Sequence, residues 1–245
     1  MKPTPNSPSD VEPLLVFGAH PDDIEFGCGG IVAREAAAGR PIHFVICSRG
    51  EAGTNGTPAL RTAESKNAAA ILGASIEFIK LDGDAHLEIK AAHAVELAGI
   101  IRRIRPSTIL APSLVENQHP DHARLGQLVR DASRLARYGG LTELRRAKPH
   151  AIATLLYYAV TIDAEPADLD PVLIDVSPAE IVDTWTRAMA AHASQLKTRN
   201  YVELQLARAK LNGSRCGVDA AIPLFPNDPL VFKSLSALRR SARRF

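Results

Sequence analysis

Four ionisable side chains lie within six residues of one another near the start of the chain. The stretch 18–30 reads GAHPDDIEFGCGG and holds His20, Asp22, Asp23 and Glu25, directly after the apolar run 14–17. Carboxylates this close repel one another, and a bound divalent cation turns that repulsion into attraction. A metal site is one explanation of the cluster. The other is a run of capping acids, since carboxylates favour helix N-termini.

A second cluster repeats the pattern of the first. The stretch ENQHPDHARLG (116–126) contains His119, Asp121 and His122, and the two clusters share the tetrad His-Pro-Asp-(Asp/His). Helix capping does not require histidine twice, so the recurrence favours the metal. We expect His20, Asp23 and His122 to be its ligands, because three protein ligands leave the open position of catalytic zinc. Ferrous iron fits the same donors on ligand chemistry alone and remains an alternative to Zn²⁺.

The other members of the two clusters suit proton transfer. A metal lowers the pKa of a bound water to about 7, and we expect Asp22 to accept the proton from that water as a general base. We expect His119, oriented by Asp121, to hydrogen-bond a developing oxyanion or to protonate a leaving group. Asp22, His119 and Asp121 are therefore the predicted catalytic residues.

Both clusters follow segments that the sequence predicts to be strands. Short apolar runs (14–19, 41–47, 75–81 and 107–113) alternate with segments of helical spacing (29–39, 58–73 and 90–106). This alternation predicts a Rossmann-like α/β fold, a mostly parallel sheet flanked by helices. In such sheets ligands bind beyond the carboxyl ends of the strands. If the strands before the two clusters are neighbours, the clusters face each other across one crevice.

The last third of the chain is expected to add to this single domain. Two more strand-like runs (153–160 and 171–177) precede a long helical stretch from 178 to about 213, the C-terminal helical extension of the predicted fold. We expect a flexible Pro- and Ser-rich leader (1–13), one domain (14–232) and a basic tail (233–245). The long C-terminal helices favour a homo-oligomer.

Composition bounds the partners and the compartment. The 245 residues are 46% hydrophobic and 23% charged, as in ordinary globular proteins, and the net charge of +2 predicts no nucleic-acid partner. The apolar runs are shorter than the roughly 20 residues of a membrane span, so no membrane partner is expected. Three cysteines without a CxxC spacing favour a reducing, cytoplasmic compartment.

Several stretches together resemble the LmbE/PIG-L family of zinc-dependent N-acetylglucosaminyl deacetylases. They read AHPDDIEFGCGG, SRGEAGTNG (48–56), RTAESKNAAAILG (61–73) and HPDH (119–122). Within the family the chain most resembles the bacillithiol-biosynthesis branch, through RYGGLTELRRAKPH (137–150), IDVS (174–177), AHASQL (191–196) and FPNDPLVF (225–232). The resemblance implies attack of a zinc-bound water on the N-acetyl group of a small N-acetylglucosaminyl conjugate, such as N-acetylglucosaminyl malate. It implies the same metal ligands and catalytic residues.

The resemblance also points to substrate-binding residues. Arg61 and Glu51 fall in the family's R-x-x-E and Gly-rich segments, and His192 and Gln195 fall in its H-x-S-Q segment. The alternative for Arg61 is a place on the helix surface, with an ion pair to Glu64 or a contact with Ser65. The Gly-rich segment could be only a turn, and His192 could have a structural role. The stretch GVDAAIPLF (217–225) departs from the family pattern, which puts the substrate pocket in doubt.

Two other functions fit parts of the pattern. A non-haem Fe(II) oxygenase also uses a His-x-Asp element completed by a second histidine. A metal-dependent sugar-binding protein without catalysis would keep the ligands but has no need of Asp22. A reaction that consumes oxygen would favour the oxygenase. Unchanged behaviour of an Asp22→Asn protein would favour the sugar-binding protein.

Overall fold

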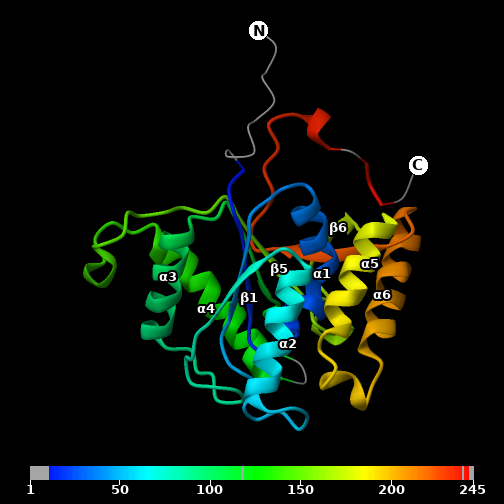
Figure 1. Ribbon diagram of the computed structural model, residues 1–245. Helices are drawn as coiled ribbons and strands as arrows, with labels where there is room; N and C mark the ends of the chain where they lie inside the picture. Colours follow the sequence, from blue (N-terminus) through cyan, green and yellow to red (C-terminus); the bar gives the residue numbers. More distant parts are fainter. Residues whose placement is uncertain (1–10, 117–118, 239, 243–245) are drawn as a thin grey trace.

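The computed structural model describes residues 11–116, 119–238 and 240–242. Within them, seven strands form one sheet in the order β3-β2-β1-β4-β5-β7-β6, shown in Figure 1. The strands are β1 (Leu14–Gly18), β2 (Ile42–Ile46), β3 (Ser75–Phe78), β4 (Thr108–Pro112), β5 (Thr154–Tyr158), β6 (Val172–Asp175) and β7 (Ala221–Pro226). The first five pair in parallel, and β7 pairs antiparallel with both β5 and β6. The predicted Rossmann-like, mostly parallel sheet is confirmed.

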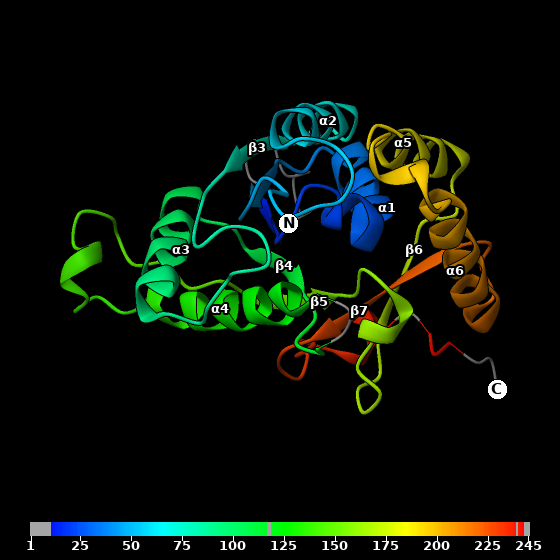
Figure 2. The same cartoon turned by 90° about the horizontal axis from the view of Figure 1, so that it is seen from below.

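Helices cover both faces of the sheet. They are α1 (Asp23–Ala37), α2 (Pro58–Ile71), α3 (Ala91–Ile104), α4 (Pro120–Ala136), α5 (Ala179–Ala190) and α6 (Tyr201–Cys216). Figure 2 shows α3 and α4 on one face and the other four on the opposite face. Alternate residues of β1 serve the two cores: Leu14 and Val16 join one, Leu15 and Phe17 the other. A strand buried on both faces must be apolar throughout, as this one is.

The structure corrects two expectations about the last third. The predicted long helix from 178 to about 213 is two helices, α5 and α6, separated by the segment 191–200. They form the expected helical extension, packed on α1 and β7 rather than apart from the sheet. Strand β7 was not predicted from the sequence. Residues 1–10 of the predicted leader and 239 and 243–245 of the predicted tail lie outside the described residues, and the described helices include none long and apolar enough to span a membrane.

The clusters singled out in the sequence come together because β1 and β4 are adjacent. Leu14, Leu15 and Val16 of β1 pair with 108–110 of β4, so both strands end at one edge of the sheet. The first cluster spans the turn after β1 and the first turn of α1, and the second lies at the start of α4 after β4. The strand order also reverses at β1, and such a reversal is where α/β sheets open a crevice for ligands.

Candidate metal centre and active site

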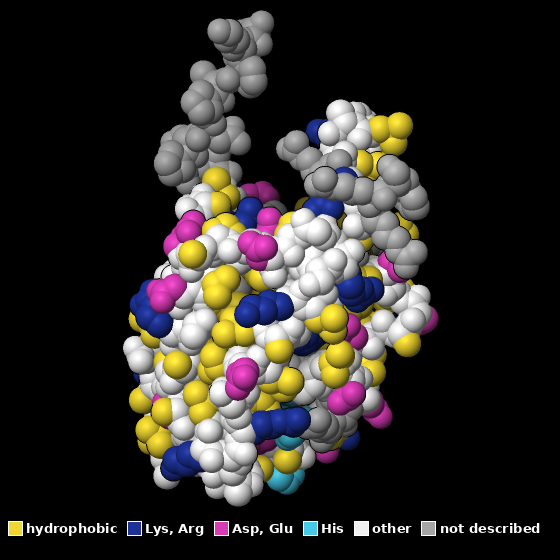
Figure 3. All heavy atoms as spheres, turned by 90° about the vertical axis from the view of Figure 1, so that its right-hand side faces the viewer, with side chains coloured by type: hydrophobic (Ala, Val, Ile, Leu, Met, Phe, Trp, Pro, Cys, Tyr) yellow, Lys and Arg dark blue, Asp and Glu magenta, His cyan; other side chains and the backbone are white. Residues whose placement is uncertain are grey.

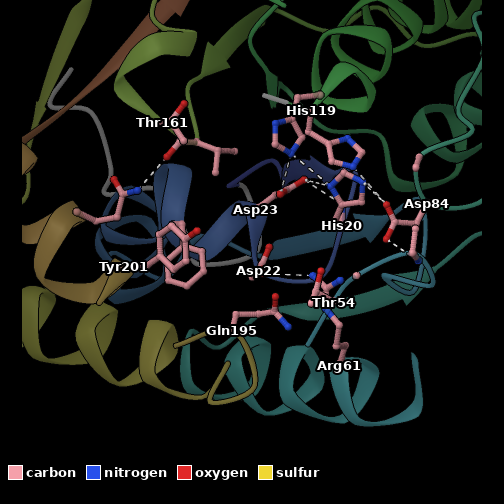
Figure 4. Close-up of a pocket in the computed structure, with 17 residues that line it drawn as sticks. His20, Asp22, Asp23, Thr54, Arg61, Asp84, His119, Thr161, Gln195 and Tyr201 are labelled. Atoms are coloured by element: carbon pink, nitrogen blue, oxygen red, sulfur yellow. Dashed lines mark hydrogen bonds and ion pairs between the residues drawn. The ribbon is translucent and has the colours of Figure 1, made fainter. Parts of the chain in front are cut away.

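Three side chains from the two clusters point their donor atoms toward one another. His122 Nε2 lies 3.1 Å from Asp23 Oδ1 and 3.3 Å from His20 Nδ1, and His20 Nδ1 lies 3.6 Å from Asp23 Oδ2. Figure 4 shows His20 and Asp23 side by side below His119 of the second cluster. Two imidazole nitrogens and a carboxylate make a donor set that fits Zn²⁺ or Fe²⁺. The structure thus brings together the three predicted ligands.

The carboxylate of Asp23 is fixed by the turn that precedes α1. Its Oδ2 accepts hydrogen bonds from the backbone N–H groups of Ala19 and His20, both at 2.9 Å, which leaves Oδ1 toward His122. Burial opposes ionisation, but the rings of His122 and His20 hold the pKa of Asp23 well below its ordinary value. Asp23 is therefore an anion aimed into the donor set.

The second nitrogen of His20 is held by two further carboxylates. Nε2 lies 3.1 Å from Asp84 Oδ1 and 3.3 Å from Asp121 Oδ2. Although burial lowers it, the pKa of His20 is raised well above its ordinary value by Asp23, Asp121 and Asp84. The site therefore favours positive charge, as a cation site should. A carboxylate on the far nitrogen is also the usual way in which a metal-bound histidine is oriented.

Asp84 was missed by the sequence analysis. It lies in the loop after β3, where its Oδ2 accepts a hydrogen bond of 3.0 Å from the backbone N–H of Ala52. Hydrogen bonds from His119 and His20 lower the pKa of Asp84 against its partial burial. The signal was available: β3 is parallel to β1, so the Asp-Gly-Asp sequence after it falls at the same edge of the sheet.

His119 and Asp121 lie beside the donor set, in an arrangement that differs from the prediction. His119 caps α4, since its Nδ1 accepts from the backbone N–H of Asp121, and its Nε2 lies 3.5 Å from Asp84. Asp121 Oδ2 is 3.9 Å from His119 but 3.3 Å from His20. Burial raises the pKa of Asp121, but the contact with His20 outweighs burial, so that the pKa is lowered overall. Asp121 thus orients His20 more directly than His119.

Asp22 has the environment of a general base. It lines the cavity and has a φ of 104°, a left-handed conformation that costs free energy for a residue other than glycine. Burial and the neighbouring Asp23 raise the pKa of Asp22 to about 6, against the positive charges of His192 and Arg61. A carboxylate with a pKa in this range takes and returns a proton near neutral pH.

Arg61 is buried inside the site instead of lying on the surface of α2. Its Nη2 donates to the carbonyl of Pro21 at 2.9 Å and lies 3.3 Å from Asp22 Oδ2. A Cβ on Gly50 or Gly53 would overlap the guanidinium group, which explains two glycines of the loop 48–56. The surface pair with Glu64 is therefore excluded, and Arg61 both lines the cavity and holds Asp22.

Of the other three predicted substrate-binding residues, only Gln195 lines the cavity. Gln195 lines the cavity and donates to the Asn55 carbonyl at 2.8 Å. Glu51 is exposed, bonds the backbone N–H of Arg49 and is not among the lining residues. His192 is fully buried and lies 3.3 Å from Glu25, behind the cavity wall. The structure thus brings Gln195 to the cavity and leaves Glu51 and His192 outside its lining.

The cavity has a volume of about 400 Å³ and one wall that sequence reasoning did not find. That wall consists of Phe26, Val160, Thr161, Tyr201 and Gln205. Tyr201 and Gln205 belong to the start of α6, which the expected continuous helix concealed. The divergent stretch 217–225 begins at Gly217, the C-cap of α6, forms most of β7 and does not line the cavity.

Comparison with known proteins places these residues in a family. Residues 15–133, which hold both clusters, match the family model PIG-L, described as GlcNAc-PI de-N-acetylase. The chain is 28% identical over 203 residues to a diacetylchitobiose deacetylase of Thermococcus kodakarensis, covering 76% of this chain and 71% of that protein. It is 27% identical over 197 residues to a probable N-acetyl-alpha-D-glucosaminyl L-malate deacetylase 2 of Bacillus cereus, covering 74% and 83%.

One relative is named for another reaction. A 4-oxalmesaconate hydratase of Pseudomonas putida is 33% identical over 138 residues, covering 51% of this chain and 53% of that protein. Among solved structures, the conserved protein TT1542 of Thermus thermophilus superimposes with a TM-score of 0.81 at 30% identity, covering 94% of this chain and all of that one. With its fold, its two clusters and these matches, the chain belongs to the PIG-L (LmbE) family.

Proposed function

We propose that this protein is a metal-dependent hydrolase that removes the N-acetyl group from a small N-acetylglucosaminyl conjugate, such as N-acetylglucosaminyl malate. The observation that carries the proposal is the position of Asp22 in one cavity with the donor set of His20, Asp23 and His122. The family match and the relatives named as deacetylases of acetylated amino sugars support it.

The metal is proposed to be zinc, held by His20, Asp23 and His122. When bound, a divalent cation supplies Lewis acidity, which polarises a carbonyl and lowers the pKa of water toward neutrality. Asp84 and Asp121 hold His20 through its other nitrogen, so that the first nitrogen keeps its direction. Ferrous iron would use the same donors, and a second sample reconstituted anaerobically with iron instead of zinc separates the two metals in the assay below.

The chain's own residues account for the proton transfers. Asp22 accepts a proton as the water oxygen adds to the carbonyl carbon of the acetamide. Negative charge then develops on the carbonyl oxygen, and His119, which lines the cavity, donates a hydrogen bond to it. The C–N bond breaks as the amine nitrogen takes up a proton from Asp22 or His119, giving acetate and a free amino sugar. Arg61 and Gln195 are proposed to bind the sugar hydroxyls.

The test is the release of acetate together with a free amine, measured for wild-type protein reconstituted with zinc. N-acetylglucosaminyl malate and N-acetylglucosamine serve as substrates, with and without a chelator. The proposal expects chelator-sensitive release of the two products in equal amounts. A hydratase or an oxygenase would release no acetate, and oxygen consumption would mark the latter. A sugar-binding protein would bind the conjugate without turnover.

A further inference from the structure

A second cavity, of about 310 Å³, opens beside the proposed active site. Thr161, Tyr201 and Gln205 line both cavities, so the two share a wall. The rest of the second cavity comes from the segment after β5 and from the outer face of α6, and we call it the α6 groove. Figure 3 looks onto the side of the molecule that carries α5 and α6, where hydrophobic side chains gather between scattered charges.

Exposed apolar side chains dominate the α6 groove. Ile162 is 58% exposed, Leu204 40% and Leu211 57%, and all three line it. Large apolar side chains that remain exposed around a hollow mark a binding surface for an apolar group.

The charges of the α6 groove are already engaged or lie at its edge. Arg208 donates to Glu165 at 2.9 and 2.6 Å and to the carbonyl of Ala159 at 2.8 Å. The guanidinium of Arg199 lies over the ring of Tyr201, 5.9 Å from its centroid. Asp163 is exposed and would repel an anion. The groove therefore suits an uncharged apolar group better than a carboxylate such as malate.

The chemistry of the substrate class connects the α6 groove to the reaction. In an N-acetylated 2-amino sugar the acetamide is on C2 and the aglycone on C1, so the aglycone leaves the ring next to the reacting amide. The cavity wall with Asp22, Arg61 and Asp84 offers charged groups, which suit sugar hydroxyls. Figure 4 shows Tyr201 and Thr161 on the opposite side from Arg61 and Asp84, and these two residues also line the groove.

We propose that the α6 groove binds an apolar aglycone, so that the substrates are alkyl or aryl glycosides of N-acetylglucosamine. This inference rests on the proposed function. It narrows the substrate class from any small conjugate to one with an apolar group on C1, and it ranks such a group above malate.

The test compares kcat/KM for acetate release from the methyl, butyl, hexyl, phenyl and malyl glycosides of N-acetylglucosamine. Each buried methylene contributes at most about fourfold, so an increase of at least about tenfold from methyl to hexyl is expected. Equal values, or a preference for malate, would overturn the inference. Affinities of the Asp22→Asn protein for the methyl and hexyl glycosides separate the two proposals. Without any turnover, tighter binding of the hexyl glycoside refutes the deacetylase but supports the groove, and equal or no binding refutes the groove as well.

Two variants place the effect in the α6 groove. Leu204→Asp puts a charge into the groove in the first turn of α6, where an acid suits the helix dipole and folding is preserved. The ratio of hexyl to methyl kcat/KM should fall by about tenfold. The matched control is Leu235→Asp, since Leu235 is 84% exposed and lines neither cavity. If Leu204→Asp keeps the ratio but dissociates an oligomer in light scattering, the groove is a subunit contact and the inference is wrong.

Discussion

At the scale of single residues, the site combines a strained acid with a buried arginine that holds it. Asp22 has a left-handed φ of 104°, and Arg61 lies 3.3 Å from its carboxylate while bonding the Pro21 carbonyl next to it. A strained conformation persists only where its surroundings fix it, and such positions cluster at functional sites. The strained backbone conformation at Asp22 thus places its carboxylate in the cavity that holds the donor set.

Asp22→Asn should remove activity and leave the metal in place. The amide has nearly the same shape but cannot accept the proton, and general-base catalysis contributes about 10²- to 10⁴-fold. We expect kcat to fall at least about 100-fold while the zinc content stays at that of wild type. Acetate-release kinetics and elemental analysis of the same preparation measure both. A variant that keeps kcat within a few-fold would exclude Asp22 as the base.

Asp84→Asn should weaken metal binding although Asp84 is outside the predicted ligand set. Asp84 lies 3.1 Å from His20 Nε2, and loss of a carboxylate behind a metal-bound histidine costs about 10- to 100-fold in affinity. Competition with a chromophoric zinc chelator gives the affinity. Glu51→Gln is the control, because Glu51 comes from the neighbouring loop and lies outside the cavity lining. Equal affinities of the two variants would remove Asp84 from the account.

The sequence allowed prediction of the three donors but of only part of what surrounds them. His20, Asp23 and His122 were found because each motif follows a strand and carries its own chemistry. Asp84 follows a predicted parallel strand, a signal that the prediction did not use, and Tyr201 lies at a helix start hidden within the expected continuous helix. His192 resembled a site residue by its segment, yet its ring is buried against Glu25.

At the scale of elements, the glycines after the first cluster let α1 pack closely on its neighbours. A Cβ on Gly27 would overlap the ring of Tyr158, and one on Gly29 would lie 2.7 Å from Trp185 Cδ1. Trp185 of α5 donates its indole N–H to the carbonyl of Glu25 at 2.7 Å. The close approach fixes the start of α1, where Asp23 faces the two histidines of the donor set.

Gly27→Ala should destabilise the protein. The overlap with Tyr158 forces α1 outward, and overpacking of this kind costs about 1–3 kcal/mol, partly offset by about 1 kcal/mol of better helix propensity. We expect a net loss of about 1 kcal/mol, a Tm lower by about 2–4 °C in calorimetry. Gly140→Ala is the control, because a Cβ there meets nothing within 4 Å. A Tm equal to that of the control would refute the packing argument.

Glu77 on the edge strand β3 gives a pH-dependent contribution to stability. It accepts from His43 on β2 at 3.0 Å and from Arg103 on α3 at 2.7 and 2.9 Å. Partial burial raises the pKa of Glu77, but these two partners outweigh it and lower the pKa below the ordinary 4.5. Because the folded pKa is depressed, the contribution is present above pH 4.5 and is lost as the pH falls through the folded pKa.

Glu77→Gln should therefore lower the free energy of unfolding at pH 7, by less than about 1 kcal/mol for a half-exposed ion pair. The difference from wild type should shrink as the pH falls below 4.5. Urea unfolding at several pH values measures it, with the exposed Glu96→Gln on α3 as the control. A difference that grows toward acid pH would have the wrong sign for this account.

The prediction of strands and helices succeeded where the hydrophobic periodicity is regular, and it failed where tertiary packing determines the ends of the elements. The strands and helices up to α4 follow the apolar runs and helical spacings of the sequence. The stretch 178–213 keeps helical spacing on both sides of a break, and the break exists because Ser194 docks on Glu64, with its N–H 2.8 Å from Oε1 and its hydroxyl 2.6 Å from Oε2. That contact has no local signal in the sequence, but Asn200, whose side chain accepts from the backbone N–H of Glu203, is a capping signal for α6 that the prediction did not use. Strand β7 contains two prolines, which are typical of loops and not of strand interiors, so the sequence does not predict it as a strand.

At the scale of the whole molecule, the active site is a product of strand order. The two His-Pro-Asp motifs are about 100 residues apart and meet only because β4 lies beside β1. The loop after β3 of that half of the sheet brings Asp84, and α6 brings Tyr201 and Gln205. The cavity thus has a charged side from the parallel half and an apolar side from the C-terminal part.

The most direct test of the account is the titration of metal-free protein with zinc while acetate release from an N-acetylglucosaminyl glycoside is measured. Activity should rise in proportion to zinc and level off at one equivalent per chain. The His122→Ala protein should neither bind that equivalent tightly nor release acetate. Acetate release that persists in metal-free protein, or in His122→Ala at the wild-type rate, would contradict the central claim that these three residues hold the metal of a hydrolase.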